Sequence, residues 1–258
     1  MATNIKELEN KIIIFAASKG AQTINVMEDL LDYIIGFFDP TGTPNKEWKY
    51  DKKDNEKFHD MMMTYLNLAA ARIEHDGWFD AWGDLFMSLI TKGGNKGQFF
   101  TPPSLCNMMS EISLQEEPQA TQHTTFGKRV VISDCACGSS RNLLAAMSVF
   151  QQKGWRKPYL VAEDLDLLCC KMSAVNMAVH GCFGEVICHD SLCEPDKVRY
   201  GYIINETLYP FPTVIPSIRA CNDANRFFGI SAWKAKKTPT ERTETASTAK
   251  SPTQLTLF

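Results

Sequence analysis

The sequence has no uninterrupted apolar run that approaches the roughly 18 residues of a membrane-spanning helix. Residues 1–11 are charged and mixed in character, unlike the basic and then apolar start of a secretion signal. An excess of basic residues is also missing, because 27 lysines and arginines stand against 30 acidic residues, a net charge of −3. We therefore expect a cytoplasmic protein without a membrane segment, whose contacts with nucleic acid depend on local patches.

Standard zinc-site spacing is absent too, although the chain has nine cysteines. Cys135 and Cys137 are separated by one residue, and Cys169 and Cys170 are adjacent. We interpret the cysteines as scattered reduced thiols and predict no metal site. The alternative is a group of histidines and cysteines whose spacing fits no standard metal signature. Its members are His180, Cys182, Cys188, His189 and Cys193.

The remaining composition, with 44% hydrophobic residues over 258 positions, predicts one main fold with a smaller accessory part. Apolar residues recur at helical spacing over residues 25–38, 56–74 and 78–89, so we predict a helical N-terminal segment at 1–95. Residues 96–232 form the predicted main domain. Residues 233–258 are rich in Thr, Lys, Ser and Pro, which predicts a disordered tail.

Within the main domain, short β-branched runs alternate with helical stretches. The predicted strands are 129–133, 159–162, 185–188 and 202–204, and the predicted helices are 141–153 and 165–180. This alternation is typical of an α/β fold with a parallel sheet, which binds its ligands at the carboxyl ends of the strands. The loops after the strands are therefore the expected location of the site.

Acidic residues follow three successive predicted strands, at Asp134, Asp164 and Asp190. Their carboxylates suit the hydroxyl and amino groups of a nucleoside, and no glycine string for phosphate accompanies them. This pattern favours a nucleoside such as S-adenosylmethionine over NAD or ATP. Two alternatives remain open: Asp134 could cap the following helix, and Asp190 could be a turn residue.

Four motifs occur in the order found in a known enzyme family. The string GQFFTP at 97–102 resembles the G-Q-[FY]-F-T-P box of the N6-adenine DNA methyltransferases related to the modification subunits of type I restriction systems. The loop DCACGS at 134–139 is similar to the family's D-P-A-C-G-S loop, and HDSL at 189–192 resembles its G-D-[ST]-L turn. Asp164 lies where the family's ribose-binding acid lies. The resemblance covers about residues 78–205 and implies a short, mostly parallel, Rossmann-like S-adenosylmethionine-dependent methyltransferase sheet with an N-terminal helical segment.

The resemblance also implies a binding site for S-adenosylmethionine. Thr101 and Pro102 would flank its methionine end, and residues 134–139 would wrap around it. Asp164 would accept from the ribose hydroxyls, and Asp190 from the adenine amino group. The full set of candidate cofactor residues is Phe99, Thr101, Pro102, Asp134, Ala136, Cys137, Gly138, Asp164, Asp190 and Ser191. Phe99 and Phe100 are equally open to a role as core anchors.

The catalytic box of the resembled family, [ND]-P-P-[FY], is altered in this chain. In the family, its acceptors hold the amino group of a flipped adenine while its aromatic ring stacks on the base. This chain has NETLY at 205–209, so both prolines are replaced in either register. If Asn205 takes the first position of the box, no aromatic residue stands in the fourth. If Glu206 takes the first position, Tyr209 stands in the fourth as the stacking ring, and we prefer this second register. These three residues are the candidate catalytic residues, and unimpaired methyl transfer is not expected.

The chain ends in QLTLF, which resembles the peptide by which bacterial DNA enzymes dock on the replicative sliding clamp. A flexible tether that presents leucines and an aromatic residue to an apolar groove suits this use. The candidate partner contacts are Gln254, Leu255, Leu257 and Phe258.

The sequence thus predicts a DNA adenine-N6 methyltransferase-family protein that binds S-adenosylmethionine and acts on DNA. Further expected partners are a specificity or partner subunit, or a second copy, and the sliding clamp. The alternative is a non-catalytic S-adenosylmethionine- or DNA-associated module tethered to the clamp. Since only about 24 residues separate Tyr209 from the tail, we expect four or five strands and an exposed sheet edge. A helix, a partner chain or a second copy would have to cover that edge.

Overall fold

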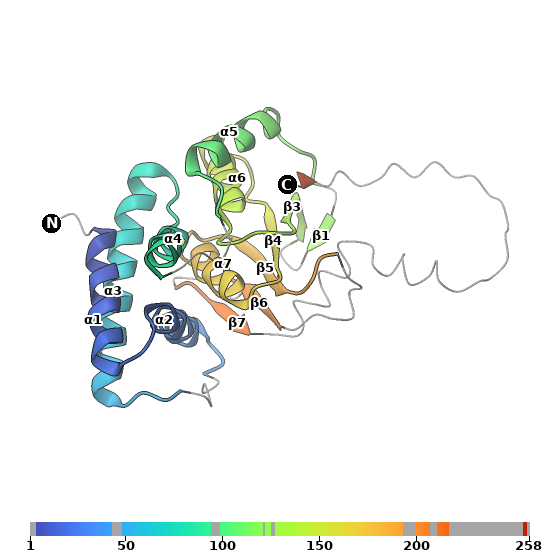
Figure 1. The fold of residues 1–258 in the computed structure, drawn as a ribbon. Coiled ribbons are helices and arrows are strands. Elements are labelled where there is room, and N and C mark those ends of the chain that lie inside the picture. The colour runs from blue at the N-terminus through green and yellow to red at the C-terminus, as the bar shows by residue number, and fades with distance from the viewer. Residues whose placement is uncertain are drawn as a thin grey trace.

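The computed structural model describes residues 4–42, 48–93, 99–120, 122–124, 127–192, 200–206, 211–216 and 255–256. It has an α/β architecture, in which N-terminal helices lie beside a mixed sheet with its own helices (Figure 1). The predicted fold class is therefore confirmed. No helix in these described ranges is long and apolar enough to cross a membrane.

The N-terminal helices are α1 (Ile5–Lys19), α2 (Thr23–Phe38), α3 (Lys52–Asp76) and α4 (Ala81–Gly93). Helix α1, which was not predicted from the sequence, begins where the Asn4 side chain accepts from the Lys6 N–H at 3.1 Å. Its buried Leu8, Ile12 and Phe15 lie on one face and pack towards α2 and α3. Helix α2 in turn packs against α7 (Leu167–Val179), which attaches the helices to the sheet.

The central sheet has the order β7-β6-β5-β4-β3-β8. Its parallel centre is made of β3 (Val131–Asp134), β4 (Tyr159–Asp164) and β5 (Phe183–Cys188). Every residue of β3 and β5 is buried, as expected for strands covered on both faces. A separate hairpin joins β1 (Gln122–Thr124) to β2 (Gly127–Arg129).

Two helices make the crossovers of the parallel centre. Helix α6 (Arg141–Gln152) connects β3 to β4, and α7 connects β4 to β5. Asp166 caps α7 by accepting from the Leu168 N–H at 2.9 Å. Helix α5 (Pro103–Ser113) follows the GQFFTP string and packs on α6. The carboxyl ends of β3, β4 and β5 consequently meet at one edge of the sheet.

The expected parallel direction of the fourth strand is wrong. Strand β6 (Tyr200–Ile204) runs antiparallel to β5, pairing Gly184 with Ile204, and β7 (Val214–Pro216) runs antiparallel to β6. Only residues 189–199 separate β5 from β6. A parallel neighbour needs a crossover of a dozen or more residues, so the shorter connection favours the antiparallel arrangement.

The edge of the sheet at β3 is paired by the chain's own C-terminal region. Strand β8 (Leu255–Thr256) runs parallel to β3, with Ile132 opposite Leu255 and Ser133 opposite Thr256. The expected disordered tail therefore contains a described strand. Gln254, Leu257 and Phe258 lie outside the described residues.

Candidate functional site

The candidate site is the carboxyl edge of β3, β4 and β5, where the loops after the three strands meet. Asp134 ends β3 and is 1% exposed. One carboxylate oxygen accepts from the Ala136 N–H at 3.1 Å, and the other accepts from Nδ2 of Asn142 at 3.2 Å. Burial raises the pKa of Asp134 to about 6, although these two donors oppose the rise. Asp134 does not cap α6, whose first turn follows Ser140.

Gly138 shapes the loop after β3 because it has φ +55°, a left-handed conformation. A Cβ atom at this position would lie 2.8 Å from the ring of Phe100. Its N–H donates to Oδ2 of Asp164 at 2.9 Å, which joins the β3 loop to the β4 loop. Only glycine therefore fits between the ring and the carboxylate.

Asp164 is partly buried, and its other oxygen accepts from the Asp166 N–H at 2.9 Å. Burial raises its pKa, and the backbone donors of Asp166 and Gly138 oppose the rise. The Leu165 N–H also lowers this pKa, and three backbone donors leave about one of the four lone-pair positions of a carboxylate unused. Asp164 thus keeps acceptor capacity at the edge where a ribose is expected from the sequence.

The loop after β5 completes the edge. Asp190 accepts from the Leu192 N–H at 3.0 Å, which makes it a turn residue as well as a candidate ligand. The hydroxyl of Ser191 donates to the carbonyl of Cys135 at 3.0 Å. Ala136 is exposed beside this contact, whereas the Cys137 side chain is buried, with Sγ 3.3 Å from the Ser173 hydroxyl.

The GQFFTP string reaches this region through its second half. The ring of Phe100 stacks on Phe86, with centroids 5.2 Å apart, and lies against Gly138. Thr101 is partly buried and its carbonyl accepts from Nη1 of Arg141 at 3.2 Å, while Pro102 is exposed before α5. Phe99 is 72% exposed, so it is not a core anchor.

The structure does not bring Asn205 and Glu206 to this edge. Asn205 follows β6 at the amino end of β5, and its Nδ2 donates to the carbonyls of Ala178 and Cys182 at 3.1 and 2.7 Å. Its Oδ1 accepts from the Thr213 N–H at 2.9 Å. Strand β5 spans about 17 Å between the two edges. Asn205 and Glu206 therefore lie at the other end of β5 from the cofactor loops, and Tyr209 lies outside the described residues.

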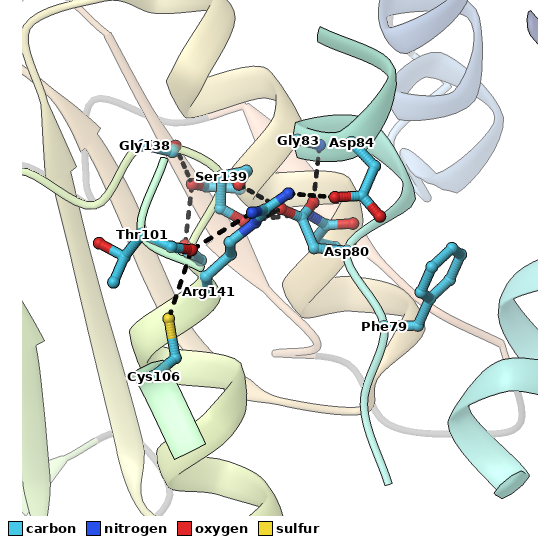
Figure 2. A network of polar contacts seen from close by, with 12 residues as sticks. Phe79, Asp80, Gly83, Asp84, Thr101, Cys106, Gly138, Ser139 and Arg141 are labelled. Atoms are coloured by element: carbon cyan, nitrogen blue, oxygen red, sulfur yellow. Dashed lines mark hydrogen bonds and ion pairs between the residues drawn. The ribbon is translucent and has the colours of Figure 1, made fainter. Parts of the chain in front are cut away.

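A buried polar network, which was not predicted from the sequence, connects the segment before α4 to the loop after β3 and to Thr101. Asp80 is 3% exposed and accepts from the Ser139 hydroxyl and from Nε of Arg141, both at 2.5 Å. Figure 2 shows the Arg141 guanidinium between Asp80, Asp84 and the Thr101 carbonyl. Burial lowers the pKa of Arg141, but the two carboxylates outweigh it and raise the pKa.

The histidines of the alternative metal cluster have other partners. His180 accepts from the Phe79 N–H at 3.0 Å through Nε2, so Nδ1 carries the proton and donates to the Asn176 carbonyl at 2.6 Å. Burial lowers its pKa to about 4. His189 Nε2 lies 2.7 Å from a carboxylate oxygen of Glu163. Cys193 lies outside the described residues, and the described ones contain no group of three or more metal-ligating side chains.

Comparison with known families supplies the decisive observation. Residues 80–251 match the N-6 DNA methylase family. The chain belongs to this family. The match begins at Asp80, the centre of the buried network, and includes all three loops of the candidate site. The resemblance drawn from the four motifs is thereby confirmed.

Similarity to solved structures of this fold is partial. One is a putative class I S-adenosylmethionine-dependent methyltransferase from Listeria monocytogenes, with 16% identity, a TM-score of 0.46, and coverage of 73% of this chain and 53% of that chain. Another is the methyltransferase subunit of a type I restriction-modification system from Streptococcus thermophilus, with 20% identity, a TM-score of 0.34, and coverage of 69% and 37%. The chain thus spans about half of the first protein and less of the second. Among curated proteins no match was found.

Proposed function

We propose that this N-6 DNA methylase family member binds S-adenosylmethionine at the carboxyl edge of β3, β4 and β5 and acts on DNA. The observation that carries the proposal is the convergence of Asp134, Asp164 and Asp190 from three successive loops. Because Asn205 and Glu206 lie at the other end of β5, a partner subunit would supply the contacts to the target adenine.

The residues present fit S-adenosylmethionine. Asp164 retains about one lone-pair position for a ribose hydroxyl, beyond those that face the backbone N–H groups of Gly138, Leu165 and Asp166. Asp190 is partly exposed and can accept from the adenine amino group. The close packing of Phe100 over Gly138 fixes the loop that would wrap the cofactor.

The charge of the edge suits the same ligand. When bound, S-adenosylmethionine supplies an electrophilic methyl group on a sulfonium cation. The carboxylates of Asp134 and Asp164 create a negative potential that favours a cation. The Thr101 carbonyl, held by Arg141, would face the methionine end.

Calorimetric titration with S-adenosylmethionine tests the cofactor site. We expect saturable binding by the wild-type chain, and about 10- to 100-fold weaker binding by Asp164→Asn, which loses the charge that hydroxyl donors favour. Asp76→Asn, a charge removal at an exposed ion pair with Arg72, is the control and should bind normally. Absence of wild-type binding at millimolar cofactor, or equal affinity of Asp164→Asn, would overturn the proposal.

Transfer of labelled methyl groups to adenine-containing DNA separates the two functional candidates. We expect transfer when the partner subunit is present and little by the chain alone, because the Asn205 carboxamide is committed to the sheet. Cofactor binding without transfer in either case would favour the second candidate, a non-catalytic module tethered to the sliding clamp by residues 254–258. Full activity of the chain alone would refute the need for a partner.

A further inference from the structure

We propose that Asp80 is a positioning residue that holds the cofactor loop in its binding conformation, acting through Ser139 and Arg141. The inference rests on the proposed cofactor site and names a residue outside it. Asp80 precedes α4 and is 59 residues away from Ser139 in the sequence.

The carboxylate of Asp80 is saturated by four donors. Oδ2 accepts from the Ser139 hydroxyl and from Nε of Arg141 at 2.5 Å each. Oδ1 accepts from the Gly83 N–H at 2.8 Å and from Nδ2 of Asn176 at 2.7 Å. All the donors point at an ionised carboxylate, and bonds to a charged acceptor are roughly twice as strong as neutral ones.

The segment that carries Asp80 is itself fixed by the last turn of α7. The Phe79 N–H donates to Nε2 of the buried His180, while the Asn176 amide holds the next residue, Asp80. Asn176 also donates to the Ser139 carbonyl at 2.9 Å, so one amide ties the loop and the carboxylate together. Asp80 therefore cannot shift without breaking bonds on two elements.

Space around the carboxylate is equally restricted. A Cβ atom at Gly83 would lie 2.0 Å from Oδ2 of Asp80 and 2.6 Å from the Ser139 hydroxyl. The DAWG string at 80–83 is thus matched to the loop: aspartate reaches Ser139 only because glycine leaves room three residues later.

The hydrogen bonds of Asp80 lead to two segments of the proposed cofactor site, the loop after β3 and the GQFFTP string. Ser139 follows Gly138, whose φ of +55° and bond to Asp164 shape the loop after β3. Arg141, held by Asp80, donates to the carbonyl of Thr101 in the GQFFTP string. One buried carboxylate therefore fixes the relative positions of two segments that would contact the cofactor.

Ser139→Ala tests the inference with a small perturbation, since it removes one hydroxyl from a residue that is 1% exposed. Ser148→Ala is the matched control: Ser148 is 4% exposed on α6, and its hydroxyl accepts from Gln152, outside the network. Hydrogen exchange of the loop amides at 136–140 is measured without cofactor, and S-adenosylmethionine affinity is measured far below the melting temperature of each variant. Asp80→Asn is a second, stronger variant.

We expect Ser139→Ala to speed exchange of the loop amides and to weaken cofactor binding, each by about 10- to 150-fold, the range for losing a hydrogen bond to a charged group. Ser148→Ala should change both by less than about twofold. Equal effects of the two variants, or a lower melting temperature with normal affinity and exchange, would show that Asp80 has only a structural role. If the wild-type chain binds no cofactor, the proposed function fails, while the exchange data still decide whether Asp80 orders the loop.

Discussion

Replacing the buried acid of the site, Asp134→Asn, should stabilise the protein at neutral pH. Burial raises the pKa of Asp134 from 3.8 to about 6, so the folded state binds its proton more tightly than the unfolded state. Stability is therefore lost as the pH rises from about 4 to about 6, and the full cost applies above that range. A difference of this size in pKa corresponds to about 3 kcal/mol, which is the upper limit of the gain from Asp134→Asn.

The local geometry can accept the amide. After the substitution, the side chain at position 134 would keep one oxygen to accept from the Ala136 N–H, and its new amide group would face Asn142. The Oδ1 atom of Asn142 is buried and has no hydrogen-bond partner among the described residues. Turning the Asn142 amide over would bring this oxygen to the new donor and move Nδ2 to the place that Oδ1 leaves, so the number of unpaired buried groups would not rise.

Urea denaturation at pH 4, 6 and 8 checks this prediction. We expect Asp134→Asn to exceed the wild type by about 1–3 kcal/mol at pH 8 and to converge with it near pH 4. Asp76→Asn is a control that should change stability in the opposite direction with pH. His75 and Arg72 lower the pKa of Asp76, so the wild-type carboxylate stabilises the fold above pH 4 and this effect is lost as the pH falls. A gain for Asp134→Asn that does not vary with pH, or a loss at pH 8, would refute the reasoning.

One substitution and one deletion probe the opposite edge and the C-terminal strand. Asn205→Ala should destabilise the fold by about 2–4 kcal/mol, because buried backbone groups lose their partners, and should leave S-adenosylmethionine affinity unchanged in calorimetry. A weakened affinity would contradict the placement of Asn205. Deleting residues 254–258 removes β8, so the amide of Ser133, which faces β8, should exchange faster and association with the sliding clamp should be lost. Unchanged association would exclude the clamp as the partner of this peptide.

The parallel centre of the sheet could be predicted because each of its strands and helices carries its own local pattern. The alternation over residues 129–188 matched β3, β4 and β5 with the helices between them. The direction of β6 was not encoded in its own residues, since an apolar run pairs equally well either way. The length of the connection was the available signal, because residues 189–199 are too few for a parallel crossover.

The loops of the site could also be predicted from local patterns, because each loop follows a recognisable strand. The buried network of Asp80 and Arg141 that holds these loops could not be predicted. Asp134 and Asp164 each follow a strand that is visible in the sequence. Asp80 and Arg141 are 61 residues apart, and neither lies in a recognised motif. Their pairing depends on how α4 packs beside α7, and long-range packing of this kind leaves no periodic trace in a single sequence.

The proposed cofactor edge and Asn205 belong to separate parts of the chain. Every described contact of the cofactor edge is made by residues between Phe79 and Leu192. Within the described residues, Asn205 bonds instead to Ala178, Cys182 and Thr213, at the other end of β5. Base recognition could therefore pass to a partner without loss of the cofactor loops, since no described hydrogen bond connects Asn205 to that edge. This separation is why we expect Asn205→Ala to lower stability but not cofactor affinity.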